Sequence, residues 1–280
     1  MRSPRSYVYL RSIMGKVVVF IVFCSFWSSL SARDSCVYLF SIPKKADFTT
    51  ADHLGNIYLL RGFEVEKYDS TGHFVSRFST NRLGAPTYVD VYNPLKIMVW
   101  YGEFQTAVFL DRNLTELGRV NLAQAGLPAL RCLTVAADGN LWAYDDVSTQ
   151  LLKLNPAGQK LLESQPLALE FGRQLAPTCI RDNSGQGPWM SDPELGVLVF
   201  DPYLRNSSAI LVKNLQSFVI QEDMACFIEK GTIRMEPVQG LGGKTIAITG
   251  RLATGAQKIW LAAGALLALT DAGVEVYHWR

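Results

Sequence analysis

The sequence predicts an all-β fold, a single six-bladed β-propeller with four-stranded blades. Three observations lead to this fold class. A unit of about forty residues repeats along the chain, each unit holds short runs of alternating apolar residues, and Asp, Asn and Gly separate the runs. Four short strands cannot bury a core alone, so such a repeat indicates blades or solenoid turns. Alternating apolar residues between tight turns favour blades.

The first 32 residues have the order of a secretory signal peptide. Four basic residues and no acidic ones precede the apolar run of residues 17–27, and small residues follow it up to Ala32. A run of about eleven residues is shorter than the roughly twenty that span a bilayer. We therefore expect a signal peptide over residues 1–32 and an exported, non-integral propeller domain over residues 33–280. The expected location is the periplasm or the periplasmic face of the outer membrane.

The predicted strands follow in order along the chain. The first unit contains Asp52-His-Leu-Gly-Asn-Ile-Tyr58, and the third contains Asp138-Gly-Asn-Leu-Trp-Ala-Tyr144. In both, Asp caps a turn and Gly accepts a positive φ, which explains these residues without a calcium ion. The strands of the second unit are expected at residues 87–91, 96–100, 107–113 and 115–120. Those of the fourth unit are expected at residues 178–181, 187–190, 196–201 and 209–212. Those of the fifth unit are expected at residues 218–220, 225–228, 232–235 and 245–248.

The last unit has only three strand signals, at residues 258–261, 265–269 and 274–279. The missing strand is expected at residues 35–42, directly after the leader. Pairing of this N-terminal strand into the last blade closes the ring and removes the exposed edge of an open propeller.

Charge and cysteine content exclude some classes of function. Four of the 27 Lys and Arg residues lie in the leader, so the remainder carries 23 basic against 25 acidic residues. A near-neutral chain without a basic patch does not indicate nucleic-acid binding. Four cysteines remain after the leader, at positions 36, 132, 179 and 226, with wide and irregular spacings. They are expected to be buried free thiols.

Two sets of motifs resemble known families. Asp52-His-Leu-Gly-Asn-Ile-Tyr58 and Lys67-Tyr-Asp-Ser-Thr-Gly-His-Phe74 resemble the NHL and related six-bladed propellers, and the resemblance covers residues 35–280. More narrowly, residues 93–99 with 108–111, and residues 192–201, are similar to an exported propeller family of Bacteroidota. The resemblance implies the fold and export but is a poor guide to activity.

No residue pattern indicates catalysis. His53, His73 and His278 lack metal-ligand spacing, and no Gly-x-Ser-x-Gly elbow occurs. We therefore predict no catalytic residue, no metal site and no cofactor. The alternative is a metal-dependent hydrolase or lactonase, because similarity to gluconolactonase-like propellers implies a cation held by carboxylates near the channel. Candidate carboxylates are Asp47, Asp90, Asp182 and Glu222, whereas Arg131 and Arg181 on innermost strands would repel a cation.

The loops between the second and third strands suggest a docking surface. In similar propellers these loops share a face with the channel mouth, and here they are aromatic and acidic. Aromatic residues are enriched at protein interfaces. The candidate partner-binding residues are Phe63, Trp100, Tyr101, Phe104, Tyr144, Asp145 and Asp192.

The function predicted from this face is a non-catalytic protein-interaction module of the cell envelope, as a scaffold or as a subunit of an envelope complex. Two alternatives stay open. Trp100 and Phe104 could instead pack between blades, and the aromatic loops could bind a small glycan or a peptide.

Overall fold

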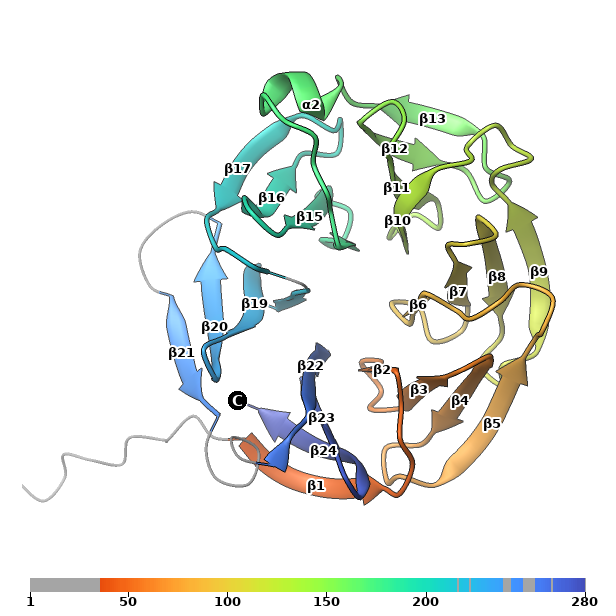
Figure 1. The fold of residues 1–280 in the computed structure, drawn as a ribbon, viewed down its shortest axis with the longest axis vertical. Helices are drawn as coiled ribbons and strands as arrows, with labels where there is room; N and C mark the ends of the chain where they lie inside the picture. The colour runs from red at the N-terminus through yellow and green to blue at the C-terminus, as the bar shows by residue number, and fades with distance from the viewer. Residues whose placement is uncertain are drawn as a thin grey trace, which may run out of the picture. The chain divides into compact units, whose positions relative to one another are not determined.

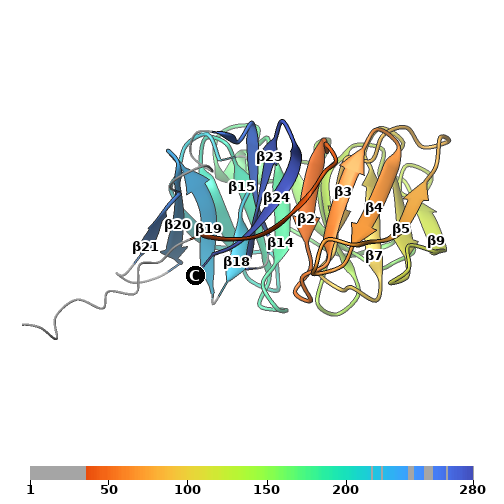
Figure 2. The ribbon, with the colours of Figure 1, turned by 90° about the horizontal axis from the view of Figure 1, so that it is seen from below.

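The described chain is built almost entirely from β-strands. The computed structural model describes residues 36–215, 217–221, 223–238, 243–248, 255–262 and 264–279, which belong to one compact unit, Ser35–Arg280. Within this unit, six four-stranded antiparallel sheets surround a central channel, and their strands run between two faces (Figures 1 and 2). The predicted six-bladed β-propeller is confirmed. The predicted signal peptide, residues 1–32, lies outside the described residues.

The first three blades follow chain order from the channel to the rim. Blade 1 contains β2 (Phe48–Ala51), β3 (Ile57–Arg61), β4 (Glu64–Tyr68) and β5 (Phe74–Ser79). Blade 2 contains β6 (Tyr88–Asp90), β7 (Ile97–Tyr101), β8 (Thr106–Leu110) and β9 (Glu116–Asn121). Blade 3 contains β10 (Leu130–Val135), β11 (Leu141–Asp145), β12 (Gln150–Leu154) and β13 (Lys160–Glu163).

The second half repeats this arrangement after a short helix, α2 (Leu167–Glu170). Blade 4 contains β14 (Cys179–Asp182), β15 (Pro188–Asp192), β16 (Gly196–Phe200) and β17 (Asn206–Ile210). Blade 5 contains β18 (Val219–Gln221), β19 (Met224–Glu229), β20 (Thr232–Pro237) and β21 (Lys244–Ala247). Blade 6 contains β22 (Lys258–Ala262), β23 (Ala265–Thr270), β24 (Gly273–Trp279) and β1 (Cys36–Ile42).

The N-terminal strand closes the ring, as predicted. β1 pairs antiparallel with β24 in a register that runs from Cys36 opposite Trp279 to Ile42 opposite Val274. Figure 1 shows β1 as the outermost strand of blade 6, next to the rim of blade 1. The edge that blade 6 would otherwise expose is therefore covered by a strand from the other end of the chain.

A capped turn joins the third and fourth strands in the first four blades. In each turn one side-chain oxygen accepts hydrogen bonds from backbone N–H groups two and four residues later. The capping residues are Asp69, Asp111, Asn155 and Asp201. Asp52 caps the first hairpin of blade 1 in the same way, and Asp138 caps that of blade 3 by accepting the Asn140 N–H. Gly55 and Gly139 in these hairpins have φ values of 82° and 81°. These turns confirm the prediction that Asp and Gly serve backbone geometry.

The hydrophobic core lies between blades. The described residues form six buried clusters, and each one joins side chains of two neighbouring blades. The second and third strands are almost completely buried, as in β7 and β8. Because the core is distributed around the ring, the innermost strands are left to line the channel.

Two further expectations concern the cysteines and the membrane. Among the described residues, Cys36, Cys132, Cys179 and Cys226 form no disulfide with one another, and Cys132 and Cys226 are buried. Burial raises the pKa of the Cys132 thiol far above its ordinary value, so this group stays protonated at neutral pH. In the part of the chain that the structure describes, no helix combines the length and the apolar character of a membrane span.

Candidate functional site

The central channel contains two cavities, one toward each face. The larger has a volume of about 590 Å³ and lies where the innermost strands begin, between residues such as Phe48, Thr178 and Lys258. The smaller has a volume of about 260 Å³ and lies where the same strands end, at residues such as Asp90 and Leu261. The second strand of each blade is antiparallel to the first, so the loops between second and third strands surround the mouth of the larger cavity.

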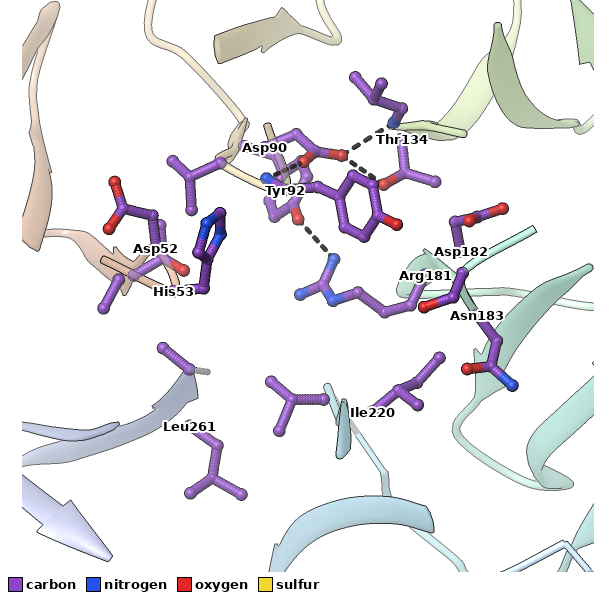
Figure 3. Close-up of a pocket in the computed structure, with 18 residues that line it drawn as sticks. Asp52, His53, Asp90, Tyr92, Thr134, Arg181, Asp182, Asn183, Ile220 and Leu261 are labelled. Carbon is purple, nitrogen blue, oxygen red and sulfur yellow. Dashed lines mark hydrogen bonds between the residues drawn. The ribbon is translucent and has the colours of Figure 1, made fainter. Parts of the chain in front are cut away.

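Tyr88 and Arg181 form the boundary between these cavities, because both residues line both of them. Arg181 Nη1 donates a hydrogen bond of 2.5 Å to the Tyr88 hydroxyl, and the guanidinium carbon lies 5.0 Å from the centroid of the Tyr88 ring. Figure 3 shows Arg181 extending across the smaller cavity toward this contact. Burial raises the pKa of the Tyr88 phenol well above its ordinary value, so Arg181 meets a neutral partner.

The carboxylates of the smaller cavity hold neighbouring blades together. Asp90 at the end of β6 accepts hydrogen bonds from Thr134 Oγ1 and from the backbone N–H of Val135, both in β10 (Figure 3). Asp182 at the end of β14 accepts hydrogen bonds from Trp142 Nε1 at 2.6 Å and from the backbone of blade 3. These two predicted channel carboxylates are buried acceptors for blade-to-blade contacts, which native structures rarely leave unsatisfied.

The other two candidate carboxylates, Asp47 and Glu222, do not join Asp90 and Asp182 in a described cluster. Asp47 is exposed and caps the β3–β4 loop by accepting the Gly62 N–H at 2.9 Å, and Glu222 lies outside the described residues. Among the described residues, no three His, Cys, Asp or Glu side chains form a group that could hold a metal ion. The hydrolase alternative gains no support from these positions.

The larger cavity brings together the two predicted channel arginines. Arg131 and Arg181 both line it, and Arg131 forms two hydrogen bonds of 2.7 Å with Asp146. Lys258 adds a third positive charge at the start of β22. The described residues that line this cavity include no Asp or Glu. Asp146 neutralises Arg131 alone, so the net charge of the lining stays positive.

Three aromatic rings form a continuous wall of the larger cavity. Phe48 meets Tyr88 and Trp260 edge to face, with ring centroids 5.9 and 6.3 Å apart. The rings come from blades 1, 2 and 6, and blades 1 and 6 are neighbours only because the ring closes. Sequence reasoning missed Phe48, Tyr88, Trp260 and Lys258 because each resembles an ordinary strand residue. The available signal was their placement on innermost strands: Phe48, Tyr88 and Lys258 are first residues of such strands, and Trp260 lies two residues after Lys258.

The aromatic residues predicted for the docking face divide into two groups. Trp100, Tyr101 and Tyr144 lie at the ends of second strands and belong to the buried clusters, with exposed fractions of 1% or less. For Trp100 this burial corresponds to the packing alternative, and Tyr101 and Tyr144, which were expected only at the docking face, are buried as well. Phe63 and Phe104 occupy the tips of the β3–β4 and β7–β8 hairpins and are 51% and 44% exposed. We therefore keep these two phenylalanines as candidate contact residues.

The predicted acidic contacts are also inside the protein. Asp145 is nearly buried and caps the β11–β12 turn by accepting hydrogen bonds from the Ser148 hydroxyl and backbone N–H. Asp192 has no exposed surface and caps the β15–β16 turn. In these positions their charges stabilise the turns between second and third strands, which together form the loop face of the propeller.

Acid is expected to weaken the fold through Asp192. Its burial acts to raise its pKa, but N–H donors of Ala176, Glu194 and Leu195 and the charge of Arg173 outweigh burial and hold the pKa below its ordinary value. The stabilisation is complete above the unfolded-state pKa, about 3.9, and is lost as the pH falls through the lower folded-state pKa. Urea midpoints measured from neutral pH downward should fall steeply once the pH is below the unfolded-state pKa of about 3.9.

The Asp192→Asn variant should have a lower midpoint at neutral pH and a shallower pH dependence below about pH 4. Asp271→Asn, at an exposed turn, is the matched control and should follow the wild-type curve. Parallel curves for wild type and Asp192→Asn would show that this carboxylate does not couple folding to pH.

The comparisons with known proteins identify a fold and no family. No protein-family model matches the sequence, and no curated protein matches it. A streptogramin B lyase structure is similar at 14% identity and a TM-score of 0.53, over 88% of this chain and 87% of that chain. A chain of a mitotic checkpoint complex is similar at 9% identity and a TM-score of 0.55, over 83% and 76%.

A protein of unknown function from Bacteroides caccae is similar at 13% identity and a TM-score of 0.49, over 77% of this chain and 83% of that chain. At such identities the lyase and checkpoint structures show the propeller fold alone. The resemblance to NHL propellers and to an exported Bacteroidota family stays a prediction.

Proposed function

We propose that the protein is a non-catalytic interaction module of the cell envelope. In this proposal the leader exports the chain, and the propeller docks a protein partner as a scaffold or as a subunit of an envelope complex. The docking surface is the loop face around Phe63 and Phe104. The channel carboxylates Asp90 and Asp182 accept hydrogen bonds that hold blades together, so they do not favour the hydrolase alternative.

One observation carries the proposal: two exposed phenylalanines occupy equivalent hairpin tips of adjacent blades. Residues 80–87, which connect the blades, lie between them. Phe63 borders a groove with Ser79, Thr80 and Asn81. On the other side, a Cβ atom at Gly84 would come within 3.3 Å of the Phe104 ring. The two rings and this connection therefore form one surface.

This surface has the composition of an interface. Large aromatic side chains are costly to leave in water and are enriched where proteins meet. Arg61 and Glu64 flank Phe63 and lie 3.7 Å apart as an exposed ion pair. An apolar centre with a charged rim is the usual arrangement at a docking site.

The Phe63→Ala/Phe104→Ala double variant is expected to lose its partner while keeping its fold. Truncating aromatic anchors in an interface typically costs about 2 kcal/mol or more, which is about a thirtyfold loss of affinity. Because both rings are half exposed, the denaturant midpoint should change little. Affinity purification from cross-linked native envelopes, with quantitative mass spectrometry, measures recovery of the partner.

Tyr203→Ala is the matched control. Tyr203 is an exposed aromatic residue in the β16–β17 turn, and turns between third and fourth strands lie on the opposite face. This variant should recover the partner at the wild-type level. Equal recovery by wild type and the double variant, or recovery of no stoichiometric protein by wild type, would contradict the proposal.

A further inference from the structure

We propose that the larger channel cavity binds a small organic carboxylate with a flat apolar body. In this site Arg181 and Lys258 hold the carboxylate, and the wall of Phe48, Tyr88 and Trp260 contacts the apolar body. The inference is independent of the docking surface, because neither Phe63 nor Phe104 lines the cavity.

The first argument is a positive charge without a direct carboxylate partner. Arg181 is half-buried, yet it pairs with no carboxylate among the described residues. The hydrogen bonds from its side chain to described residues leave from Nη1 alone, to the Tyr88 hydroxyl and to the Ile180 carbonyl. Asp90 stabilises its charge from the side of the smaller cavity, but it forms no hydrogen bond or ion pair with the guanidinium and is held instead by Tyr92, Thr134 and Val135. A partly buried guanidinium in this state favours an incoming anion.

Lys258 strengthens the same field at the rim. Its ammonium group is exposed and has no ionic partner among the described residues. By contrast, Arg131 is neutralised by its two hydrogen bonds to Asp146. The cavity therefore offers two available cationic side chains, one deep and one at the mouth, and no competing carboxylate among its described lining residues.

The second argument is the aromatic wall. The edge-to-face contacts of Phe48 with Tyr88 and with Trp260 hold the three rings in a fixed relation. Such a wall presents flat apolar surface to whatever occupies the cavity. A volume of about 590 Å³ lies in the range of small-molecule sites, which combine mostly apolar walls with a few placed polar groups.

These features favour a carboxylate over the other anions. A phosphate carries more charge and needs more donors than one guanidinium and one ammonium provide. It also has no apolar surface to contact an aromatic wall. A cation is repelled by Arg181 and Lys258. A monoanion with an apolar body satisfies the charge, the donors and the rings together.

The test is a titration of the full protein with 3-phenylpropionate. Trp100 and Trp260 line the cavity, so tryptophan fluorescence reports binding, and calorimetry confirms it. The neutral match, 3-phenylpropanamide, should bind about tenfold more weakly or worse, because charge-assisted hydrogen bonds are lost. A short peptide ending in phenylalanine with a free carboxylate, compared with its amidated form, shows whether the carboxylate belongs to a free metabolite or to a peptide C-terminus.

Two variants locate the site. Lys258→Gln is fold-safe because the residue is exposed, and it should weaken binding about threefold or more. Arg181→Gln should weaken binding about tenfold or more. Lys244→Gln removes an equal charge from the exposed edge strand β21 and should leave binding unchanged. If Arg181→Gln does not fold, the affinities of Lys258→Gln and Lys244→Gln for 3-phenylpropionate are compared instead, and weaker binding by Lys258→Gln alone supports the site.

Several results would overturn the inference. These are no binding of 3-phenylpropionate at millimolar concentration, equal binding of the amide, and unchanged affinity in the folded Lys258→Gln and Arg181→Gln variants. Inorganic phosphate binding as tightly as 3-phenylpropionate would show a general anion site without a role for the rings. None of these results bears on recovery of a partner by Phe63 and Phe104, so the two proposals fail separately.

Discussion

A chain that begins at Pro43, and so lacks β1, is expected to lose most of its stability and to aggregate. Without β1, the edge of β24 is exposed along the register from Val274 to Trp279, and an unpaired edge is a template for association. Ile42 is 1% exposed, and burying such a side chain contributes about 1.5–3 kcal/mol on its own. We expect a total loss of at least about 4 kcal/mol, or about 10 °C in Tm.

The effect should extend beyond blade 6. Ile42 belongs to the cluster that joins blade 6 to blade 1, and the Phe40 ring lies against Gly72 of blade 1, where a Cβ atom would approach it to 2.7 Å. β1 therefore joins the first and last blades as well as completing the sheet. In a ring whose blades contact only their neighbours, opening one junction weakens both of its sides.

A chain that begins at Ser35 and keeps β1 is the control for this truncation. Within the strand, Ile42→Ala should be strongly destabilising, whereas Val37→Ala, at an exposed position, should be nearly neutral. Size-exclusion chromatography and thermal melts measure both effects. A monomeric Pro43 chain with an unchanged Tm would show that β1 does not close the ring.

The fold could be predicted from sequence because its signals are local. Turn-capping Asp residues, positive-φ Gly residues and short apolar runs lie within a few positions of each other, so each hairpin is specified by its own residues. The second unit illustrates this: strands expected at residues 87–91 and 96–100 are observed as β6 (Tyr88–Asp90) and β7 (Ile97–Tyr101). Closure followed from counting, since three strand signals at one end required a fourth elsewhere.

The channel could be predicted only in part. Placing Arg131 and Arg181 on innermost strands was enough to expect them in the channel. Their partners could not be derived, because Arg181 and Tyr88 are 93 residues apart in sequence and meet across the channel from blades 4 and 2. The aromatic wall likewise depends on ring closure, since Trp260 and Phe48 come from the last and first blades.

The loop face shows why exposure is harder to predict than strands. The sequence predicts a loop that starts at Trp100, the last residue of the expected strand, and continues with Tyr101, but both are the last two residues of β7. Successive side chains of a strand point to opposite sides. Between packed blades both sides are core: Trp100 belongs to the cluster of blades 2 and 3, and Tyr101 to that of blades 1 and 2. Sequence alone does not show how much of the hairpin between the second and third strands of a blade is covered by the neighbouring blades.

Replacing Trp100 by Ala is therefore expected to destabilise the protein by about 3–5 kcal/mol, the range for a fully buried large aromatic side chain. The indole packs between blades 2 and 3 and lines the larger cavity, so its removal leaves a void in the core. The denaturant midpoint should fall accordingly, with a similar result for Tyr101→Ala.

Measuring partner recovery on the same variant separates the two roles considered for this residue. If Trp100 acts through packing, partner recovery should fall only under conditions where the Trp100→Ala protein unfolds, and it should return to the wild-type level when temperature or osmolyte restores the fold. Phe104→Ala is the matched comparison, because Phe104 lies four residues away on the same hairpin but is 44% exposed. It should show the reverse pattern, with a near wild-type midpoint and reduced recovery. A stable Trp100→Ala protein that releases its partner would place the indole in the interface and contradict its assignment to the core.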